Sequence, residues 1–274
     1  MGGEKEVVTE VVVIGGGLSG ICAATHLRRS GIPFVVLEKN HSLGGTWLEN
    51  TYPGSGCDVM SHLYSFSFRP NPGWSRMWSK QEEILDYLNF VVDAEGVRES
   101  FHFNRAVTTA EWLEEESMWR ITATATAAGG GMEEGETMTV RATACICGTG
   151  QLNAPSFPPL PGVNGGTFKG EAEFHTARWR HDVSLKGKRV VVLGNGASAI
   201  QFLPEIAPDC EKLTVIQRTP SHIIPKSDSV YSAFVLFLFR YVPLVLWLYR
   251  CYLYWSLEYG WLGFKERVAK YNKW

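Results

Sequence analysis

The sequence lacks a charge bias, a C-x-x-C pair and a recognisable secretory signal. Its 26 Lys and Arg residues nearly balance 28 Asp and Glu, giving a net charge of −2, so no nucleic-acid partner is indicated. Six cysteines occur without a C-x-x-C spacing; we predict no metal site and expect free thiols in a reducing compartment. The charged opening MGGEKEVVTE is not a secretory signal, which favours an intracellular, cytoplasmic protein.

Long uncharged runs are lacking even where the chain is most apolar. Residues 231–259 are rich in aromatic and aliphatic side chains, but Arg240 and Arg250 interrupt them and Pro243 lies among them. The uncharged runs are about nine residues long, whereas a membrane-spanning helix needs roughly 20. We predict a buried apolar helical segment over 227–274, and a segment that rests on a membrane surface is the alternative.

The sequence does contain a glycine-rich turn between a strand and a helix. Val11–Ile14 is a β-branched run, typical of a strand buried on both faces. Gly15, Gly17 and Gly20 follow in the spacing G-x-G-x-x-G, and residues 21–30 have helical character. The first glycine allows the turn, the second lets the backbone approach a pyrophosphate, and the third lets helix and strand pack closely. The phosphates would lie at the helix N-terminus.

A second predicted strand, Phe34–Leu37, ends in Glu38, which is 23 residues after Gly15. At that position an acidic side chain accepts a hydrogen bond from a ribose hydroxyl. These features predict an α/β, Rossmann-like dinucleotide-binding domain over residues 1–152. The other elements expected there are a helix from Ser79 or Lys80 to Ala94, a strand over 101–110, a β-meander over about 105–141 with short strands at 119–125 and 137–141, and a buried strand over 142–147.

A second turn of the same kind follows a stiff connector rich in Pro and Gly. Arg189–Leu193 is typical of a buried strand, and it leads into Gly194-Asn195-Gly196-Ala197-Ser198-Ala199, the variant G-x-G-x-x-A. Arg218 lies 24 residues after Gly194, where the first unit has Glu38. We therefore predict a linker over 153–184 and a partial second dinucleotide-binding domain over 185–226.

The opposite charges at these two positions favour different nucleotides. A carboxylate accepts from a ribose 2′-OH and repels a 2′-phosphate, whereas a guanidinium offers a forked, charged donor to that phosphate. Glu38 therefore predicts FAD or NAD in the first unit, and Arg218 predicts NADPH in the second. The alternative for Arg218 is a solvated charge at the end of a strand.

Three further stretches extend the pattern. They are Gly44–Trp47 with the loop YPGSGCD and Tyr64, then Gly148-Thr149-Gly150, and finally Phe168–Trp179. The last is similar to F-x-G-x-x-x-H-x-x-x-W-[P/D], and together the motifs resemble the class B flavin monooxygenases, Baeyer–Villiger monooxygenases in particular. One extra residue separates Gly170 from His175, and Arg180 replaces Pro or Asp. Trp179 favours the Baeyer–Villiger branch over the N-oxygenating relatives.

The resemblance implies a two-cofactor oxidation. NADPH on the second fold would reduce FAD on the first, and O2 would then form a C4a-peroxyflavin that converts a ketone to an ester or lactone. Asp58 would be catalytic by supporting an arginine that a later segment contributes. The residues implied for FAD are Gly15, Gly17, Gly20, Glu38, Thr46, Trp47, Asp58, Tyr64 and, beside the adenine, Val107.

For NADPH the resemblance implies the second glycine turn and the loop that precedes Asp58. That loop would meet the nicotinamide end. The NADPH residues are Gly56, Cys57, Gly194, Asn195, Gly196, Ala197, Ser198, Arg218 and Thr219. The residues of the linker pattern, thought to couple domain motions, are Phe168, Gly170, His175 and Trp179.

Other functions stay open at this point. An N-hydroxylating or S-oxygenating flavin monooxygenase is the alternative enzyme, and a truncated, inactive nucleotide-binding remnant is the alternative of another class. We expect the chain to be a C-terminal truncation, because the arginine that Asp58 would support comes from a later segment. A disulfide reductase is disfavoured, because Trp47 follows Gly-Gly-Thr and Cys57 has no nearby cysteine.

Overall fold

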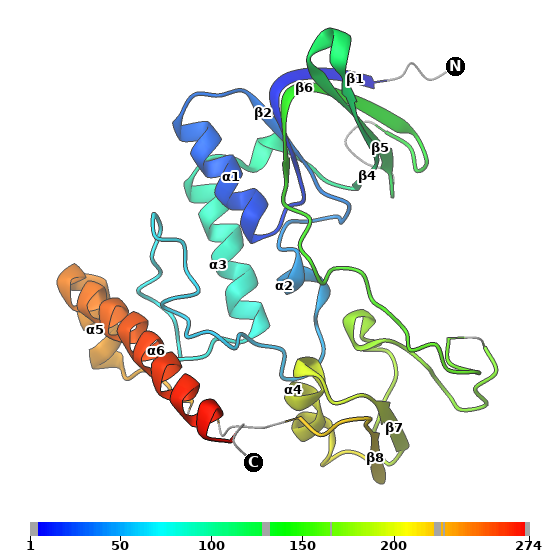
Figure 1. The fold of residues 1–274 in the computed structure, drawn as a ribbon, viewed down its shortest axis with the longest axis vertical. Coiled ribbons are helices and arrows are strands. Elements are labelled where there is room, and N and C mark those ends of the chain that lie inside the picture. Colours follow the sequence, from blue (N-terminus) through cyan, green and yellow to red (C-terminus); the bar gives the residue numbers. More distant parts are fainter. Residues whose placement is uncertain (1–4, 128–131, 165, 222–225, 227, 272–274) are drawn as a thin grey trace. The chain divides into compact units, whose positions relative to one another are not determined.

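The computed structural model describes residues 5–127, 132–164, 166–221, 226 and 228–271. Contacts divide the chain into two compact units, each of which is described by itself (Figure 1). The first unit contains Met1–Ser55 and Ile84–Arg218, and the second contains Gly56–Glu83 and Thr219–Trp274. The domain boundaries predicted from the sequence follow the nucleotide-binding motifs instead, and they stay a prediction.

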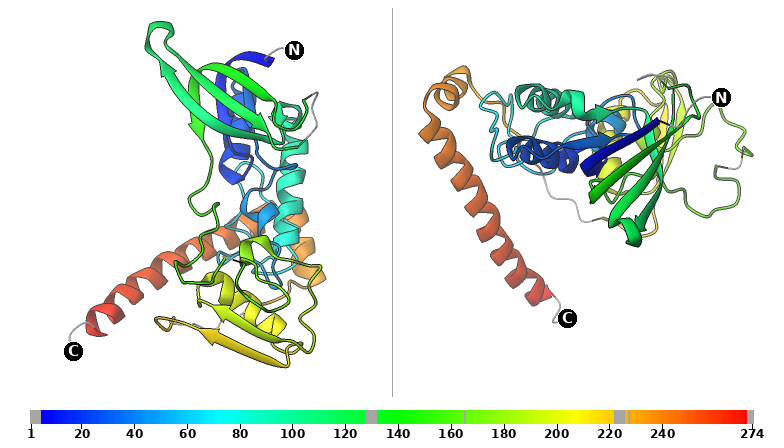
Figure 2. Two further views of the ribbon diagram at one scale, coloured as in Figure 1. Left: turned by 90° about the vertical axis from the view of Figure 1, so that its right-hand side faces the viewer. Right: turned by 90° about the horizontal axis from the view of Figure 1, so that it is seen from above.

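The first unit is built on a six-stranded sheet in the order β3-β2-β1-β6-β5-β4. Strands β3, β2, β1 and β6 are parallel, and β6, β5 and β4 form an antiparallel meander. Helices α1 and α3 run alongside the parallel part (Figures 1 and 2), and the predicted α/β class is confirmed. The bounds are β1 Lys5–Ile14, α1 Leu18–Arg29, β2 Phe34–Leu37, α3 Gln81–Ala94, β3 Phe101–His102, β4 Arg105–Leu113, β5 Met118–Ala125 and β6 Thr137–Cys147.

Two strand predictions in the meander region were wrong. The strand expected over 101–110 is divided, because Asn104 has a φ of 55° and its N–H donates to the Asn40 carbonyl at 2.9 Å. The two strands expected over 137–141 and 142–147 are the single strand β6. The reason is that β1 begins at Lys5, so its early residues supply a parallel partner for the first half of β6.

The core lies around the centre of the sheet. Val12 and Val13 of β1 are fully buried, as the β-branched run predicted. A cluster on the meander side joins Val12 to Ile121, Met138 and neighbouring apolar side chains. The buried side chains of α3 are Ile84, Tyr87, Leu88, Val91 and Val92, spaced as expected for one face of an amphipathic helix.

The second glycine turn lies in a smaller parallel pair. Strands β7 (Arg189–Leu193) and β8 (Lys212–Ile216) flank helix α4 (Ala197–Ile206). One face of the pair packs on Phe202 and Ile206, whereas Val191, at 59% exposure, points away from that core. The local strand-turn-helix-strand prediction is therefore met, but the prediction that Arg189–Leu193 is a buried strand was wrong, because one face of β7 is exposed.

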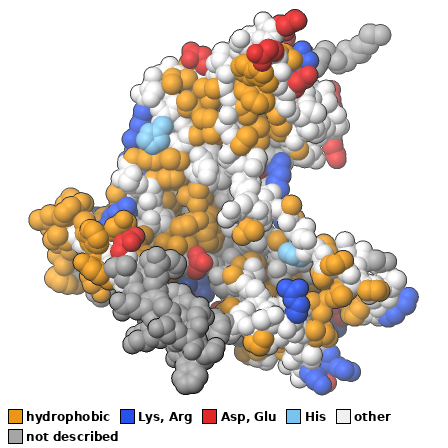
Figure 3. Space-filling model, in the orientation of Figure 1, with side chains coloured by type: hydrophobic (Ala, Val, Ile, Leu, Met, Phe, Trp, Pro, Cys, Tyr) orange, Lys and Arg blue, Asp and Glu red, His pale blue; other side chains and the backbone are white. Residues whose placement is uncertain are grey.

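The second unit contains a loop region and two helices, α5 (Ala233–Tyr241) and α6 (Pro243–Tyr271). Phe239, Leu246 and Leu253 are buried, while other apolar side chains of these helices, such as Trp247, are exposed. Hydrophobic side chains gather on the surface over this part of the chain (Figure 3). The prediction of buried helices thus holds only in part. Among the described residues, no single helix is long and apolar enough to cross a membrane; α5 and residues 243–260 pass that test only as a pair bent by 107°.

Close packing between α1 and the first turn predicts a large effect of one methyl group. A Cβ on Gly20 would lie 1.8 Å from the Gly15 carbonyl oxygen, so we expect Gly20→Ala to destabilise the fold by about 2–3 kcal/mol. Gly260→Ala is the matched control, because a Cβ there meets nothing within 4 Å and alanine favours a helix. Thermal unfolding followed by circular dichroism measures both, and an unchanged melting temperature for Gly20→Ala would contradict the packing.

Candidate functional site

The first unit contains a pocket of about 460 Å³ at the carboxyl ends of its parallel strands. This is where open α/β sheets bind ligands. The wall is formed by the ends of β1, β2 and β6, the start of α1, and residues of the segment that follows β2. Of the residues predicted for FAD, those that line this pocket are Gly15, Gly17, Glu38, Thr46, Trp47 and Val107.

Three glycine-containing segments meet at the base of this pocket. Gly15 has a φ of 104°, and a Cβ on it would lie 2.5 Å from the carbonyl oxygen of Gly148. The N–H of Gly44 donates to the Gly16 carbonyl at 2.9 Å, and a Cβ on Gly45 would lie 3.0 Å from the Cα of Gly17. Only residues without side chains allow this approach, and it leaves a pocket floor made of backbone.

The start of α1 suits an anionic group. The helix begins at Leu18 after Gly17, and its first turn contains no acidic residue. Its first N–H groups lack partners within the helix, and the helix dipole favours negative charge there. Lys39 and Arg105 also line the pocket, so a diphosphate fits the charge as well as the shape of this wall. Gly20 lies off the wall and packs α1 against the turn.

Glu38 is held at the end of β2 by the neighbouring backbone. It is only 4% exposed, and its carboxylate accepts hydrogen bonds from the N–H groups of Gly16 at 2.6 Å and Asn40 at 2.9 Å. These bonds fix the carboxylate at the pocket wall, and each of its oxygens can still accept a further hydrogen bond, such as one from a ribose hydroxyl.

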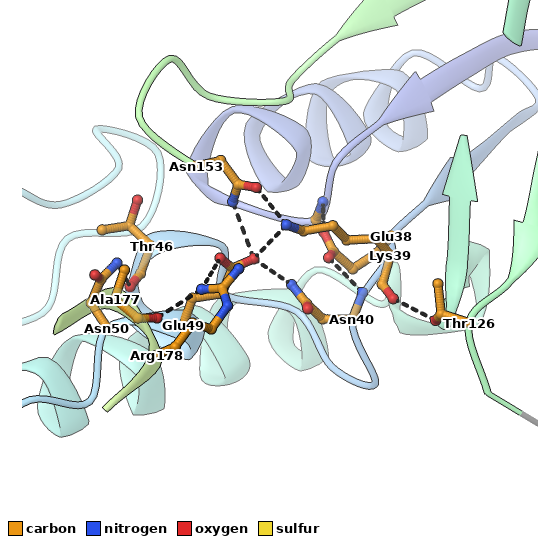
Figure 4. A network of polar contacts seen from close by, with 11 residues as sticks. Glu38, Lys39, Asn40, Thr46, Glu49, Asn50, Thr126, Asn153, Ala177 and Arg178 are labelled. Carbon is orange, nitrogen blue, oxygen red and sulfur yellow. Dashed lines mark hydrogen bonds and ion pairs between the residues drawn. The ribbon is translucent and has the colours of Figure 1, made fainter. Parts of the chain in front are cut away.

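A polar network beside Glu38 was missed by the sequence analysis (Figure 4). Lys39 and Asn153 line the pocket, and both contact Glu49 of the short helix α2 (Thr46–Glu49). Arg105 is a further pocket residue that the sequence analysis missed. It lies two positions before Val107 on β4, and because alternate residues of a strand share a face, the prediction of Val107 could have been extended to Arg105. Asn153 gave no signal, because it lies in an irregular connector.

The second glycine turn repeats the local geometry of the first in an open setting. Gly194 has a φ of 102°, and its N–H donates to the Ile216 carbonyl at 2.8 Å. A Cβ added to Gly194 would meet no atom within 4 Å, so the turn is open on that side. The Asn195 amide donates to Gln217 at 2.7 Å, which fixes the turn against the end of β8. Gly196, Ala197, Arg218 and Thr219 are exposed, and Ser198 is half-buried.

The residues of the linker pattern act in packing. His175 accepts a hydrogen bond from the Ala177 N–H at 3.1 Å and begins a short 3-10 helix, Thr176–Arg178. Trp179 packs against Phe202 of α4, with ring centroids 5.4 Å apart. The ring of exposed Phe168 covers Gly170 so closely that a Cβ there would lie 2.2 Å from it.

Asp58 and its neighbours lie in the second unit. Cys57 is 2% exposed; its N–H donates to the Ser79 carbonyl at 3.1 Å, and its own carbonyl accepts from Lys226 Nζ at 2.7 Å. Gly56 forms a β-bridge with Lys80, and Asp58 is exposed. Tyr64 is half-buried, and its N–H donates to the carbonyl of Met60, four residues earlier. The segment before Asp58 is thus anchored, and Lys226 is an anchor that the sequence analysis missed.

Comparison with known proteins identifies the family. The profile described as pyridine nucleotide-disulphide oxidoreductase matches residues 9–239. The chain belongs to this family. The curated relatives that it matches include Baeyer–Villiger monooxygenases of Streptomyces coelicolor, 43% identical over 98% of this chain and 51% of the relative, and of Pseudomonas aeruginosa, 41% identical over 93% and 46%. The chain spans about half the length of these relatives.

Solved structures lead to the same group. A closed structure of cyclohexanone monooxygenase superimposes with a TM-score of 0.75 at 36% identity, covering 86% of this chain and 43% of that one. A structure described as OTEMO in complex with FAD and NADP gives a TM-score of 0.74 at 33% identity, covering 85% and 43%. The resemblance to Baeyer–Villiger monooxygenases predicted from the motifs is confirmed.

Cys57 does not have the properties of a redox-active thiol. Burial raises the pKa of the Cys57 thiol to about 11, whereas reactive redox thiols have a lowered pKa. All six cysteines are free, so Cys57 has no disulfide partner in the structure. Cys57 therefore does not belong to a reactive dithiol, although the family description includes disulphide oxidoreductases.

The raised pKa predicts a pH-dependent lack of reactivity. At pH 8 we expect iodoacetamide to modify exposed Cys147 at least roughly 100-fold faster than buried Cys57. Only the thiolate reacts, and with a pKa of about 11 the Cys57 thiol is almost entirely protonated at pH 8. Peptide mass spectrometry measures both rates, and unfolding in urea should remove the difference. Equal labelling of both thiols in the folded chain would contradict the assignment.

Proposed function

We propose that the pocket of the first unit binds FAD. The observation that carries this proposal is the meeting of three glycine segments beside the N-terminus of α1, with the Glu38 carboxylate on the same wall. The helix N-terminus would hold the diphosphate, and Glu38 would accept from the ribose of the adenosine half. The OTEMO structure, which contains FAD and NADP, supports the choice of FAD over NAD for this pocket.

We propose that the second turn binds NADPH. Support comes from the open geometry at Gly194 and Gly196 and from the exposed guanidinium of Arg218, which suits a 2′-phosphate. A cyclohexanone monooxygenase from Rhodococcus sp. Phi1, 36% identical, was solved with NADP+. NADPH would supply electrons to FAD, and the role of the segment from Gly56 to Asp58 would be to meet the nicotinamide end.

The proposed activity is that of a flavin-dependent monooxygenase, in which this chain forms the part that binds the cofactors. When bound, FAD supplies the chemistry with O2, and the residues of this chain bind it, orient it and exclude water. Cyclohexanone monooxygenase, which resembles this chain, was solved with cyclohexanone bound and with epsilon-caprolactone bound, and this favours a ketone as the small-molecule substrate and an ester or lactone as the product. Asp58 is proposed to take part in catalysis by supporting an arginine that a later segment contributes.

Two lesser proposals concern where the protein works. Free cysteines are compatible with a reducing, intracellular compartment. Residues 231–259 stay a candidate for peripheral membrane contact, favoured by exposed aromatic side chains such as Trp255 at 56% exposure.

FAD binding tests the first proposal directly. The purified chain should bind one FAD and become yellow, and Glu38→Ala should weaken FAD binding by roughly 10- to 100-fold, since hydrogen bonds to a carboxylate are lost. Glu38→Gln keeps the size of the side chain, and its affinity for FAD should lie between those of the wild-type chain and Glu38→Ala. FMN lacks the adenosine half that Glu38 would contact, so FMN should bind the wild-type chain and Glu38→Ala with equal affinity. Flavin fluorescence titration measures these affinities, and Glu115→Ala on the exposed meander is the control.

Arg218 predicts a preference between nicotinamide cofactors. We expect Arg218→Gln to weaken NADPH binding by roughly 10-fold and to leave NADH binding unchanged, because only NADPH carries the 2′-phosphate. Exposed Arg189 on the same small sheet gives the control Arg189→Gln. Anaerobic bleaching of bound FAD by NADPH provides the second readout. A yellow protein that NADPH never bleaches would favour the inactive remnant over the enzyme.

A further inference from the structure

Glu49 joins four segments of the first unit through one buried carboxylate. Its side chain is 7% exposed, and its Oε1 accepts from Asn40 Nδ2 at 2.8 Å and Asn153 Nδ2 at 3.1 Å. Lys39 Nζ lies 3.0 Å from Oε1, and Arg178 Nη1 donates to Oε2 at 3.1 Å (Figure 4). The carboxylate is thus bound by residues of the segment after β2, by Asn153 at the start of the linker, and by Arg178 further along the linker.

The partners of Glu49 belong to two different parts of the unit. Lys39 and Asn153 line the pocket proposed for FAD, and Lys39 also donates to Asn153. Arg178 is not among the lining residues; it ends the 3-10 helix that precedes Trp179, whose ring packs on α4. One side chain therefore touches both the wall of the first nucleotide pocket and the segment that leads to the second fold.

Glu49 stays ionised in this position. Burial raises the pKa of its carboxyl, but hydrogen bonds from Asn40, Lys39 and Asn153 lower it more, and the pKa lies below its ordinary value. An ionised carboxylate with so little exposure to water depends on its donors, so a ligand that moves or holds Lys39 and Asn153 acts on the same carboxylate to which Arg178 binds.

We propose that Glu49 is a positioning residue that couples occupancy of the FAD pocket to docking of the linker at Arg178. The inference rests on the proposed FAD site. Coupling between two binding events is reciprocal, so FAD should tighten the hold on the linker, and the linker contact should tighten FAD binding by the same factor.

Limited trypsin digestion tests the coupling, because Arg178 is itself a cleavage site. In the full 274-residue chain, FAD should slow cleavage after Arg178 at least fivefold, the lower end of ordinary coupling free energies. In Glu49→Gln, the protection should fall below twofold. Glu95→Gln is the matched control: Glu95 is equally buried, at 6% exposure, and pairs with Arg29 at 2.8 Å on another surface. It should keep the full protection.

A second variant keeps the inference testable if Glu49→Gln does not fold. Arg178→Gln should weaken FAD binding at least severalfold, even though Arg178 does not line the pocket, because the coupling of the two binding events is reciprocal. Equal protection in Glu49→Gln and wild type, absent protection in a wild-type chain that does bind FAD, or unchanged affinity in Arg178→Gln would each overturn the coupling. A wild-type chain that binds no FAD would instead overturn the proposed function, and the coupling with it.

Discussion

The candidate site depends on the close approach of backbone at the carboxyl ends of β1 and β6. Gly15 faces the carbonyl of Gly148, and Gly16 accepts a hydrogen bond from Gly44, so three loops meet without side chains between them. This approach leaves the N-terminus of α1 clear for an anion and holds Glu38 on the pocket wall. A side chain at Gly15 would separate the loops and disturb the pocket as a whole.

The part of the fold that the sequence predicted is the part that short-range patterns determine. The turn between β1 and α1, the strand Phe34–Leu37 and the acid that ends it follow from glycine spacing and β-branched runs. The continuity of β6 was not predictable, because it depends on pairing with the early residues of β1, more than 130 positions away. The exposed face of β7 was missed for a related reason. A run of apolar residues indicates that a strand can be buried, but the neighbouring elements in the fold decide which of its faces are covered.

The site follows the same division. Gly15, Gly17 and Glu38 belong to a local motif, whereas Glu49 meets Asn153 and Arg178 from 104 and 129 positions away, and no periodicity encodes such a meeting. The grouping of Gly56–Glu83 with the C-terminal helices is likewise a matter of tertiary contacts. Sequence reasoning was therefore strongest for the pocket floor and weakest for the charged groups that join separate segments.

The most direct measurement for the central claim is a diffraction structure of the chain crystallised with FAD. The account predicts diphosphate oxygens about 3 Å from the backbone N–H groups of residues 17–19, with a ribose hydroxyl donating to Glu38. It would be contradicted by FAD bound at the second turn, Gly194–Ser198, with the first turn empty.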